Sequence, residues 1–343
     1  MSTSNPGSTM VMVAQPSWFT RFFSWLGWFL FAITAISLLG FVGRLSDYFN
    51  TTGNITEKYV SGGKYAQDKI AVISIEGVIM EGDGFVKRQI ERVHEDEHVK
   101  AIVVRVDSPG GTVTGSDFIY HHLNKLRKEK NIPVVVSMGS VAASGGYYVS
   151  MAVGNQEKVI YAEPTTTTGS IGVIIPHYDI SGLMEEYHVK DDSIASGPRK
   201  QLLSMTRPLS DDHRAIVKDY INESFVRFKE IIKSGRPQFD DHPEQLDELA
   251  TGEIFSASKA KKNGLIDEIG FLEDAIDRAL EMAQLEKKNT RVVKYSRPTA
   301  LLEALGGAQA AHTQLDTMFE LSSPKAYYLS TTLPAIFSTR RAD

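Results

Sequence analysis

Three glycine-containing segments carry hydroxyl side chains whose types and spacing could support acyl chemistry. They are Asp107–Gly111 (DSPGG), residues 139–148 (GSVAASGGYY) and Thr168–Val173 (TGSIGV). The first two follow apolar runs that read as buried strands, and the third begins beside one. Open α/β sheets bind their ligands beyond the carboxyl ends of the strands. The pattern therefore predicts a single site to which all three segments contribute.

Ser144 is the strongest candidate for a nucleophile in these segments. It follows a predicted strand, and the small residues around it suit a tight turn into a helix. A serine at a helix N-terminus lies close to free backbone N–H groups, which stabilise a developing oxyanion. Gly145 would supply one such N–H, and Gly110 or Gly111 could supply a second. The residues alone leave open that Ser144 is a helix cap and that Ser-Pro-Gly-Gly is an ordinary turn.

The elements that must position these segments follow from the periodicity of apolar residues. Val- and Ile-rich runs predict strands, helical periodicity predicts helices between them, and this alternation predicts an α/β fold of βαβ units around a largely parallel sheet. A longer helix is expected from Ser210 to Gly235, because acidic residues follow Ser210 and glycine closes it. The expected strands are 69–79, 101–108, 133–138, 158–163 and 170–175, and the other expected helices are 86–98, 115–129, 256–263 and 271–285.

Residues 22–43 form an apolar run without a charged side chain. Arg21 and Arg44 bracket it, and Trp18, Trp25 and Trp28 crowd one end. A bilayer core needs about 20 apolar residues in a helix, and tryptophan is enriched at membrane interfaces. The alternative is a cleaved secretory signal, but the run exceeds the signal's usual apolar length and no Ala-x-Ala site follows. The sequence therefore predicts a retained transmembrane anchor that binds lipid.

Composition argues against several other classes of function. The formal net charge is −5, and the sequence has no basic block typical of a nucleic-acid-binding face. It has no cysteine, which removes disulfides, thiolate metal sites and cysteine nucleophiles. Its nine histidines show no His-Glu-x-x-His spacing. We expect neither a metal nor another cofactor.

Five segments in a fixed order resemble the S49 serine peptidases of the signal peptide peptidase A type. They are DSPGGTV, GSVAASGGYYVSMA, TGSIGVI, SGPRKQLLS and TGEIFSASKAKKNGLIDEIG. With the apolar run they cover roughly residues 20–285, and the single copy of each is similar to the short form of the family. The resemblance implies a fold related to Clp protease and crotonase. It also implies a catalytic pair formed by a serine and a lysine.

The resemblance assigns roles to individual residues. The nucleophile falls on Ser144, the general base on Lys200, and the serine that holds the lysine amine on Ser170. The oxyanion donors fall on the backbone N–H groups of Gly110 or Gly111 and of Gly145. The surroundings of the base depart from the family's usual Gly-Lys-Tyr-Lys-Asp, because this chain has Gly-Pro-Arg-Lys-Gln.

A lysine acts as a base only when neutral, so its pKa must fall well below the usual value of about 10.4. Burial in an apolar site has that effect, and Leu202 and Leu203 beside the lysine are compatible with it. A Ser-His-Asp triad with His121, His122 or His177 is the alternative mechanism. None of these histidines lies in a segment resembling a Clp protease histidine motif.

The resemblance implies a membrane-anchored serine endopeptidase that hydrolyses remnant signal peptides through an acyl-enzyme. It also implies a homo-oligomer, a place in the bacterial inner membrane and an extracytoplasmic catalytic domain. Two alternatives stay open: a crotonase-like acyl-CoA hydratase or isomerase, and a catalytically silent membrane scaffold that binds peptides. The expected organisation is a tail (1–21), the anchor (22–43), a linker (44–63), the peptidase domain (64–290) and a loosely ordered C-terminal extension (291–343).

Overall fold

The computed structural model describes residues 18–49, 55–297 and 326–329, and the chain divides into two compact units, Met1–Gly53 and Asn54–Asp343. In the first unit the structure describes one helix, α1 (Trp18–Phe49), with Trp18, Trp25 and Trp28 exposed. Among the described residues, no helix combines the length and apolar character needed to cross a membrane. The structure therefore does not confirm the anchor predicted at residues 22–43.

The second unit is built on a mixed sheet whose centre is parallel. Its described strands follow the order β1-β10-β2-β3-β5-β6-β9, and β7 pairs with both β5 and β8. β10, β2, β3, β5, β6 and β9 run parallel to their neighbours along this path, whereas β1 is antiparallel to β10. The strands are β1 (Thr56–Gly62), β2 (Lys69–Glu76), β3 (Val99–Ser108), β5 (Val134–Ala143), β6 (Ile160–Ala162), β7 (Thr167–Gly169), β8 (Ile254–Ser256), β9 (Glu268–Ile269) and β10 (Arg291–Ser296).

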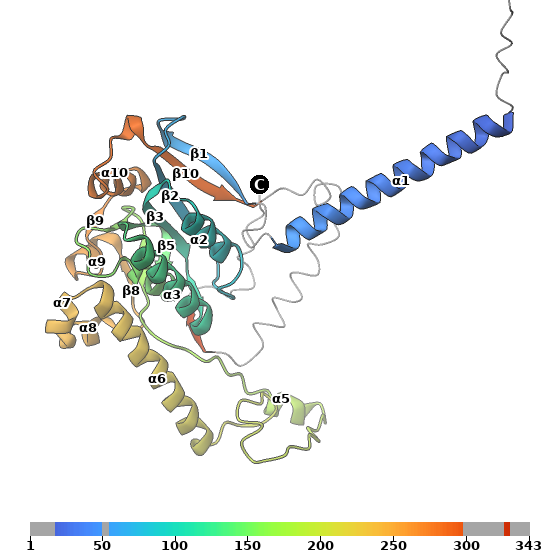
Figure 1. The fold of residues 1–343 in the computed structure, drawn as a ribbon. Coiled ribbons are helices and arrows are strands. Elements are labelled where there is room, and N and C mark those ends of the chain that lie inside the picture. Colours follow the sequence, from blue (N-terminus) through green and yellow to red (C-terminus); the bar gives the residue numbers. More distant parts are fainter. Residues whose placement is uncertain (1–17, 50–54, 298–325, 330–343) are drawn as a thin grey trace, which may run out of the picture. The chain divides into compact units, whose positions relative to one another are not determined.

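Helices cover both faces of this sheet (Figure 1). α2 (Phe85–Glu95) and α3 (Val113–Lys130) lie on one face, and α10 (Leu272–Met282) lies on the other. Burial on both faces explains why β3 is almost continuously apolar from Ala101 to Val106. The predicted α/β class with a largely parallel sheet is confirmed. The remaining helices are α4 (Gly145–Ser150), α5 (Ser181–Glu186), α6 (Asp211–Gly235), α7 (Gln238–Asp241), α8 (Pro243–Leu249) and α9 (Ala257–Lys262), with 3-10 turns at Met151–Val153 and Lys287–Asn289.

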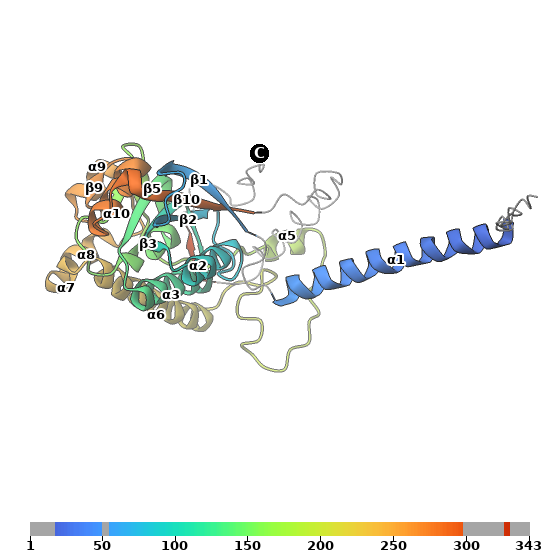
Figure 2. The same ribbon diagram turned by 45° about the horizontal axis from the view of Figure 1, so that its top comes forward.

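The long helix α6 begins as the sequence predicts. Ser210 is its N-cap, and the Ser210 side chain accepts a hydrogen bond from the backbone N–H of His213. Between β7 and α6, residues 176–209 form an excursion that carries α5. Both views show this excursion standing away from the sheet, beyond the N-terminal end of α6 (Figures 1 and 2).

A second, two-stranded sheet joins distant parts of the sequence. β4 (Gly110–Thr112) pairs antiparallel with β11 (Tyr327–Leu329), and Tyr327 also bridges Ile174. β11 belongs to the segment expected to be a loosely ordered extension, so that prediction is wrong for residues 327–329. It is also wrong for residues 291–296, because β10 pairs between β1 and β2 inside the main sheet. The rest of the predicted extension, residues 298–325 and 330–343, lies outside the described residues.

The strand predicted at residues 170–175 is also wrong. The chain instead forms the short strand β7 at Thr167–Gly169, and its extended course stops there. Gly169 and Ser170 have φ values of +82° and +51°, which lie in the left-handed region and end a strand. This turn places Ser170 at the end of β7 rather than inside a strand.

Candidate active site

Ser144 lies at a strained turn between β5 and α4. It is the N-cap residue of α4, with φ +55° and ψ −113°, a conformation that a residue with a Cβ rarely adopts. Its side chain is buried, and its Oγ has no hydrogen-bond partner among the described residues. A buried hydroxyl without a partner is uncommon in folded proteins. Strain and an unpartnered nucleophile in one residue favour a catalytic role over simple helix capping.

The glycines of the first two segments pack directly against one another. A Cβ on Gly145 would lie 3.1 Å from both the Gly110 Cα and the Gly111 N. A Cβ on Gly110 would lie 2.7 Å from the Gly145 N. A Cβ on Gly110 would collide with the Gly145 backbone, and a Cβ on Gly145 would collide with the Ser116 Oγ at 2.4 Å, so glycine at both positions allows this approach. The structure thus brings Gly110, Gly111 and Gly145 together beside Ser144.

The two candidate donors in β4 differ in what their N–H groups face. The N–H of Gly110 donates to the Ser108 Oγ at 3.1 Å, so that donor is already used. Gly111 lies opposite Tyr328 in the β4–β11 pair. Of the two glycines, Gly111 is therefore the one whose N–H can donate towards β11.

The pairing of β5 with β7 places Ser170 next to Ser144. Ala143 and Gly169 are partners in the parallel pair β5–β7, and each of the two serines follows one of these partners directly. The N–H of Ser144 donates to the Gly169 carbonyl at 2.7 Å. Ser170 is buried and has a positive φ of its own. The serine expected to hold the lysine amine is thus beside the candidate nucleophile.

The structure does not bring Lys200 to Ser144 and Ser170. It lies in the exposed excursion, where its N–H donates to the Gly197 carbonyl at 3.2 Å, and its side chain is exposed. It lines a surface hollow together with Asp212 and His213. Within the described part of this single chain, Ser144 lacks the base that the family motif predicts.

The triad histidines are not placed as bases either. The His177 Nε2 lies 3.2 Å from the Ser204 carbonyl, and His121 and His122 contact each other on α3. Because the Ser144 Oγ has no partner among the described residues, none of the three is hydrogen-bonded to it. In the described ranges, no group of three His, Asp or Glu side chains could hold a metal ion.

The strand β11 lies between β4 and Ile174, and the space that it fills is called the groove from here on. It is held on one side by β4 and on the other by Ile174, which exchanges two backbone hydrogen bonds with Tyr327 at 2.9 and 3.0 Å. The Val113 N–H donates to the Ala326 carbonyl at 3.1 Å. An extended segment bonded on both sides in this way is how β-augmentation binds a peptide.

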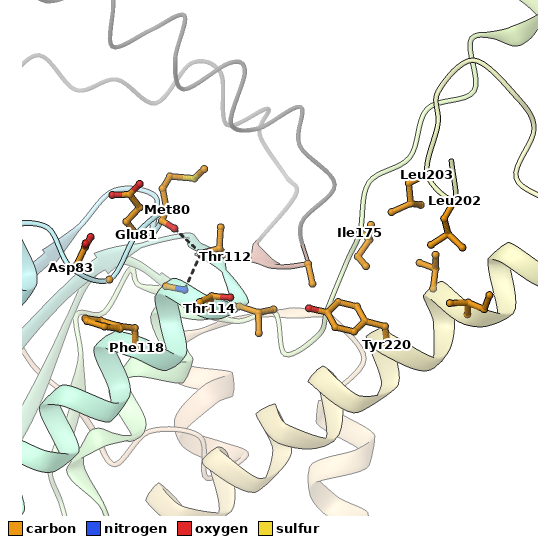
Figure 3. A pocket seen from close by; sticks show the side chains of 16 residues that line it. Met80, Glu81, Asp83, Thr112, Thr114, Phe118, Ile175, Leu202, Leu203 and Tyr220 are labelled. Atoms are coloured by element: carbon orange, nitrogen blue, oxygen red, sulfur yellow. Dashed lines mark hydrogen bonds between the residues drawn. The ribbon is translucent and has the colours of Figure 1, made fainter. Parts of the chain in front are cut away.

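A cavity of about 870 Å³ continues from the N-terminal end of β11. Thr112 lines one side, Leu202 and Leu203 line the other, and Ile175 and Tyr220 lie between them (Figure 3). Ala326 also lines the cavity. Glu81 and Asp83 lie at its acidic edge. The cavity does not include Ser144 or Lys200, so it is an extension of the groove rather than the reaction site.

Comparisons of the sequence with known proteins identify one family. The model of "Peptidase family S49" matches residues 126–286, a range that includes Ser144, Ser170 and Lys200. A protein of Enterococcus faecium that carries the name signal peptide peptidase SppA is 33% identical over 269 residues, which cover 74% of each chain. This chain belongs to peptidase family S49. It is an SppA-type S49 peptidase, as the five ordered motifs predict.

Other relatives are longer than this chain. Protease 4 of Salmonella typhi is 36% identical over 226 residues, which cover 64% of this chain and 35% of that protein. The chloroplastic serine protease SPPA of Arabidopsis thaliana is 32% identical over 276 residues, which cover 76% of this chain and 39% of the relative. The matched region is little more than a third of each of these two proteases.

The sequence patterns do not predict β11, which lies beside the candidate site. The sequence Ala-Tyr-Tyr-Leu at residues 326–329 has four apolar residues in a stretch otherwise rich in small and polar ones. Two adjacent tyrosines near the C-terminus were the available signal, because aromatic residues favour strands. The pairing partner β4, far back in the sequence, could not be read from that signal.

Proposed function

We propose that this S49 peptidase is a serine endopeptidase in which Ser144 is the nucleophile and Lys200 the general base. One observation carries the proposal: Ser144 has a buried, unpartnered Oγ next to a groove that holds an extended peptide segment, β11. Family membership favours peptide hydrolysis over the acyl-CoA and scaffold alternatives. The proposal requires no cofactor.

The backbone around Tyr328 supports this assignment. Its carbonyl oxygen lies 2.1 Å from the position that a Gly110 Cβ would take, and the Gly145 N lies 2.7 Å from that position. Hydrogen bonds alternate sides along a strand, and Tyr327 bonds to Ile174, so the Tyr328 carbonyl faces Gly111. The Tyr328 carbonyl thus lies among the candidate oxyanion donors, where the reacting carbonyl of a substrate is expected.

The reaction follows from these groups. The Ser144 Oγ attacks the carbonyl carbon while its proton passes to the neutral Lys200 amine, and the N–H groups of Gly111 and Gly145 stabilise the oxyanion. The C–N bond then breaks, and the leaving amine takes the proton from Lys200. Water attacks the Ser144 ester next, giving its proton to the Lys200 amine. The peptide leaves as a carboxylic acid and Ser144 regains its hydroxyl.

We propose further that Lys200 reaches Ser144 from a second copy of the chain. Lys200 is exposed on an excursion that also exposes Tyr178, Leu183 and Tyr187, each more than half accessible. Apolar residues gathered on one projecting segment are typical of an interface. Contact with a second copy would bury the excursion, and burial favours a neutral lysine amine. A head-to-tail contact whose rotation closes forms a ring, and we propose a ring for the homo-oligomer that the family resemblance implies.

Membrane attachment and substrate belong to the same proposal. The apolar run 22–43, inside α1, supports an anchor. The bacterial inner membrane and an extracytoplasmic second unit are proposed from the family resemblance. An anchored active site would meet remnant signal peptides, which are extended and apolar. Carbonate extraction and detergent release of the full chain test the anchor. Recovery of the full chain in the soluble fraction contradicts it.

The test of the shared site uses two inactive variants of the full chain. We expect Ser144→Ala and Lys200→Ala each to lose hydrolysis of a quenched apolar peptide, while His177→Ala stays active. Co-expression of the first two in equal amounts should restore about a quarter of wild-type activity, because one site in four joins an intact serine to an intact lysine from the neighbour. No recovery in a folded, mixed assembly contradicts the shared site. Full activity of Lys200→Ala contradicts the dyad itself.

A further inference from the structure

The excursion carries Lys200 on a loop whose two ends are tied together. This Lys200 loop comprises residues 192–205, with Asp191 directly before it and Thr206 directly after it. The Thr206 hydroxyl donates to the Asp191 Oδ2 at 2.5 Å, across 15 positions of sequence. The Arg207 Nη2 donates to the same oxygen at 3.2 Å. The Asp191 carboxylate therefore closes the loop that contains the proposed base.

Asp191 is itself held in one orientation. Its Oδ1 accepts hydrogen bonds from the backbone N–H of Ser193, at 3.0 Å, and from the Ser193 hydroxyl. Both carboxylate oxygens are thus engaged, and only 12% of the side chain is accessible. Hydrogen bonds from Ser193 and Thr206 hold the pKa of Asp191 well below its usual range, so the carboxylate is charged at neutral pH.

The Thr206 end of the Lys200 loop is fixed to the outgoing arm of the excursion. The Ile180 N–H donates to the Met205 carbonyl at 2.9 Å. Because the single Thr206 hydroxyl proton goes to Asp191, the Ser204 hydroxyl is the donor in its 2.7 Å bond to Thr206. Asp191 thus joins the start of the loop to an end that is already anchored.

Between residues 192 and 204, the described backbone hydrogen bonds are short-range turns. The Lys200 N–H donates within such a turn, and the Leu202 N–H donates to the Arg199 carbonyl at 3.2 Å. The ion pair of Arg199 with Asp212, at 3.4 Å, joins two exposed side chains and therefore contributes little. Tying the ends of a segment lowers its conformational freedom, so the closure at Asp191 restricts the positions open to Lys200.

We propose that Asp191 is a positioning residue for Lys200, which it serves by bonding Thr206 and closing the Lys200 loop. The inference rests on the proposed function. A general base contributes to the rate only when its amine lies within hydrogen-bonding reach of the nucleophile, and a misplacement of about 1 Å costs about 100-fold. Opening the loop should therefore slow the reaction, although Asp191 does not itself touch the reacting atoms.

The first experiment measures kcat for full-length variants with the quenched apolar peptide, after folding and assembly are checked for each. Thr206→Val removes the hydroxyl that bonds Asp191 and keeps the side-chain shape, whereas Thr206→Ser keeps the hydroxyl. Asp179→Ala is the matched control. Asp179 lies in the same excursion and accepts the same two kinds of bond from Ser181, at 2.9 and 2.6 Å, within its own turn.

We expect Asp191→Ala and Thr206→Val each to lower kcat about 10- to 100-fold, and Thr206→Ser and Asp179→Ala to stay within about threefold of wild type. The double variant Asp191→Ala/Thr206→Val should lose no more than Asp191→Ala alone, because both changes break the same contact. Equal kcat in Asp191→Ala and Asp179→Ala overturns the proposal. Equal loss in Thr206→Val and Thr206→Ser also overturns it.

The second experiment uses the mixed assembly of Ser144→Ala and Lys200→Ala chains, in which the Ser144→Ala chain supplies the lysine. Asp191→Ala placed on that chain should lower the recovered activity about 10- to 100-fold. The same change on the Lys200→Ala chain should leave the recovered activity within about threefold. Saturating peptide removes effects on KM from Leu202 and Leu203 of the Lys200 loop, which line the cavity.

The outcomes separate positioning of the base from a general role in the fold. Equal loss in both placements overturns the proposal, because it shows that Asp191 does not act through Lys200. If the mixture without Asp191→Ala recovers no activity, the shared site fails, and the comparison of Thr206→Val with Thr206→Ser still decides the role of Asp191. No cleavage by a folded, assembled wild type counts against the proposed function itself.

Discussion

Gly110 is the residue at which the groove, the candidate nucleophile's helix and β11 meet, and Gly110→Ala is the sharpest single test of the site. Its φ is +100°, where a residue with a Cβ is strained by about 1–3 kcal/mol. The new Cβ would lie 2.1 Å from the Tyr328 oxygen and 2.7 Å from the Gly145 N. Both contacts are backbone contacts, so a backbone must move.

The magnitude follows from that movement. Relief of the two contacts requires a shift on the order of 1 Å, and a misplacement of that size costs about 100-fold in rate. We therefore expect kcat/KM for a peptide substrate to fall about 100-fold or more. We also expect faster backbone hydrogen exchange at residues 326–329, because the same Cβ occupies the place of the β11 carbonyl.

Gly77→Ala is the matched control. Gly77 also has a positive φ, +74°, but nothing lies within 4 Å of its Cβ position. It carries the backbone strain without the collision, so it should lose similar stability and keep its activity. If Gly110→Ala is folded and its kcat/KM stays within about threefold of Gly77→Ala, the convergence of these backbones is not what builds the site.

Three further predictions concern the site and the fold. Ser170→Ala should lower kcat by about 10- to 100-fold with little change in KM, because it removes a group expected to position the lysine amine. A rise in KM as large as the fall in kcat argues against that role. Burial, and then the charge of Asp117, raise the pKa of Tyr328 well above its usual range. The buried Tyr328 phenol therefore stabilises β11 fully below the ordinary tyrosine pKa of about 10, and this stability is lost as pH rises beyond it. The protection factor at 326–329, which is the exchange rate corrected for base catalysis, should fall above pH 10 in the wild type and stay constant in Tyr328→Phe. Arg236→Met should lower the free energy of unfolding by about 1–3 kcal/mol in urea titrations, because it removes the ion pair that the buried Arg236 makes with the half-buried Asp267 at 2.7 Å, whereas Lys287→Met at an exposed pair should change it by less than about 1 kcal/mol.

The spacing of apolar residues and the helix caps predict most of the central strands and the longer helices. α6 begins at its serine cap and ends at Gly235, and α3 and the central strands lie close to their predicted ranges. Ordered motifs predict the glycine loops as one site, and the structure packs Gly110 against Gly145. These outcomes follow because apolar alternation and caps act within one element.

The remaining differences come from interactions that local sequence does not encode. The run 170–175 is as rich in isoleucine and valine as a strand, but the positive φ at Ser170 ends the extended chain there. β11 forms because β4 and Ile174 both offer it backbone partners, which depends on tertiary structure. The motif identifies Lys200 by its neighbours but does not show that it lies on an exposed excursion away from Ser144.

The attachment of β11 to the same chain has a consequence for substrate competition. Thirty residues separate Ser296 at the end of β10 from Tyr327 at the start of β11. Because β11 belongs to the same chain, its binding in the groove is intramolecular, with an effective concentration on the order of millimolar. On the proposed function, every peptide that enters the groove must displace an intramolecular ligand present at that concentration. Dilute or weakly bound peptides would then be spared, and the enzyme would act where substrates accumulate to high local density.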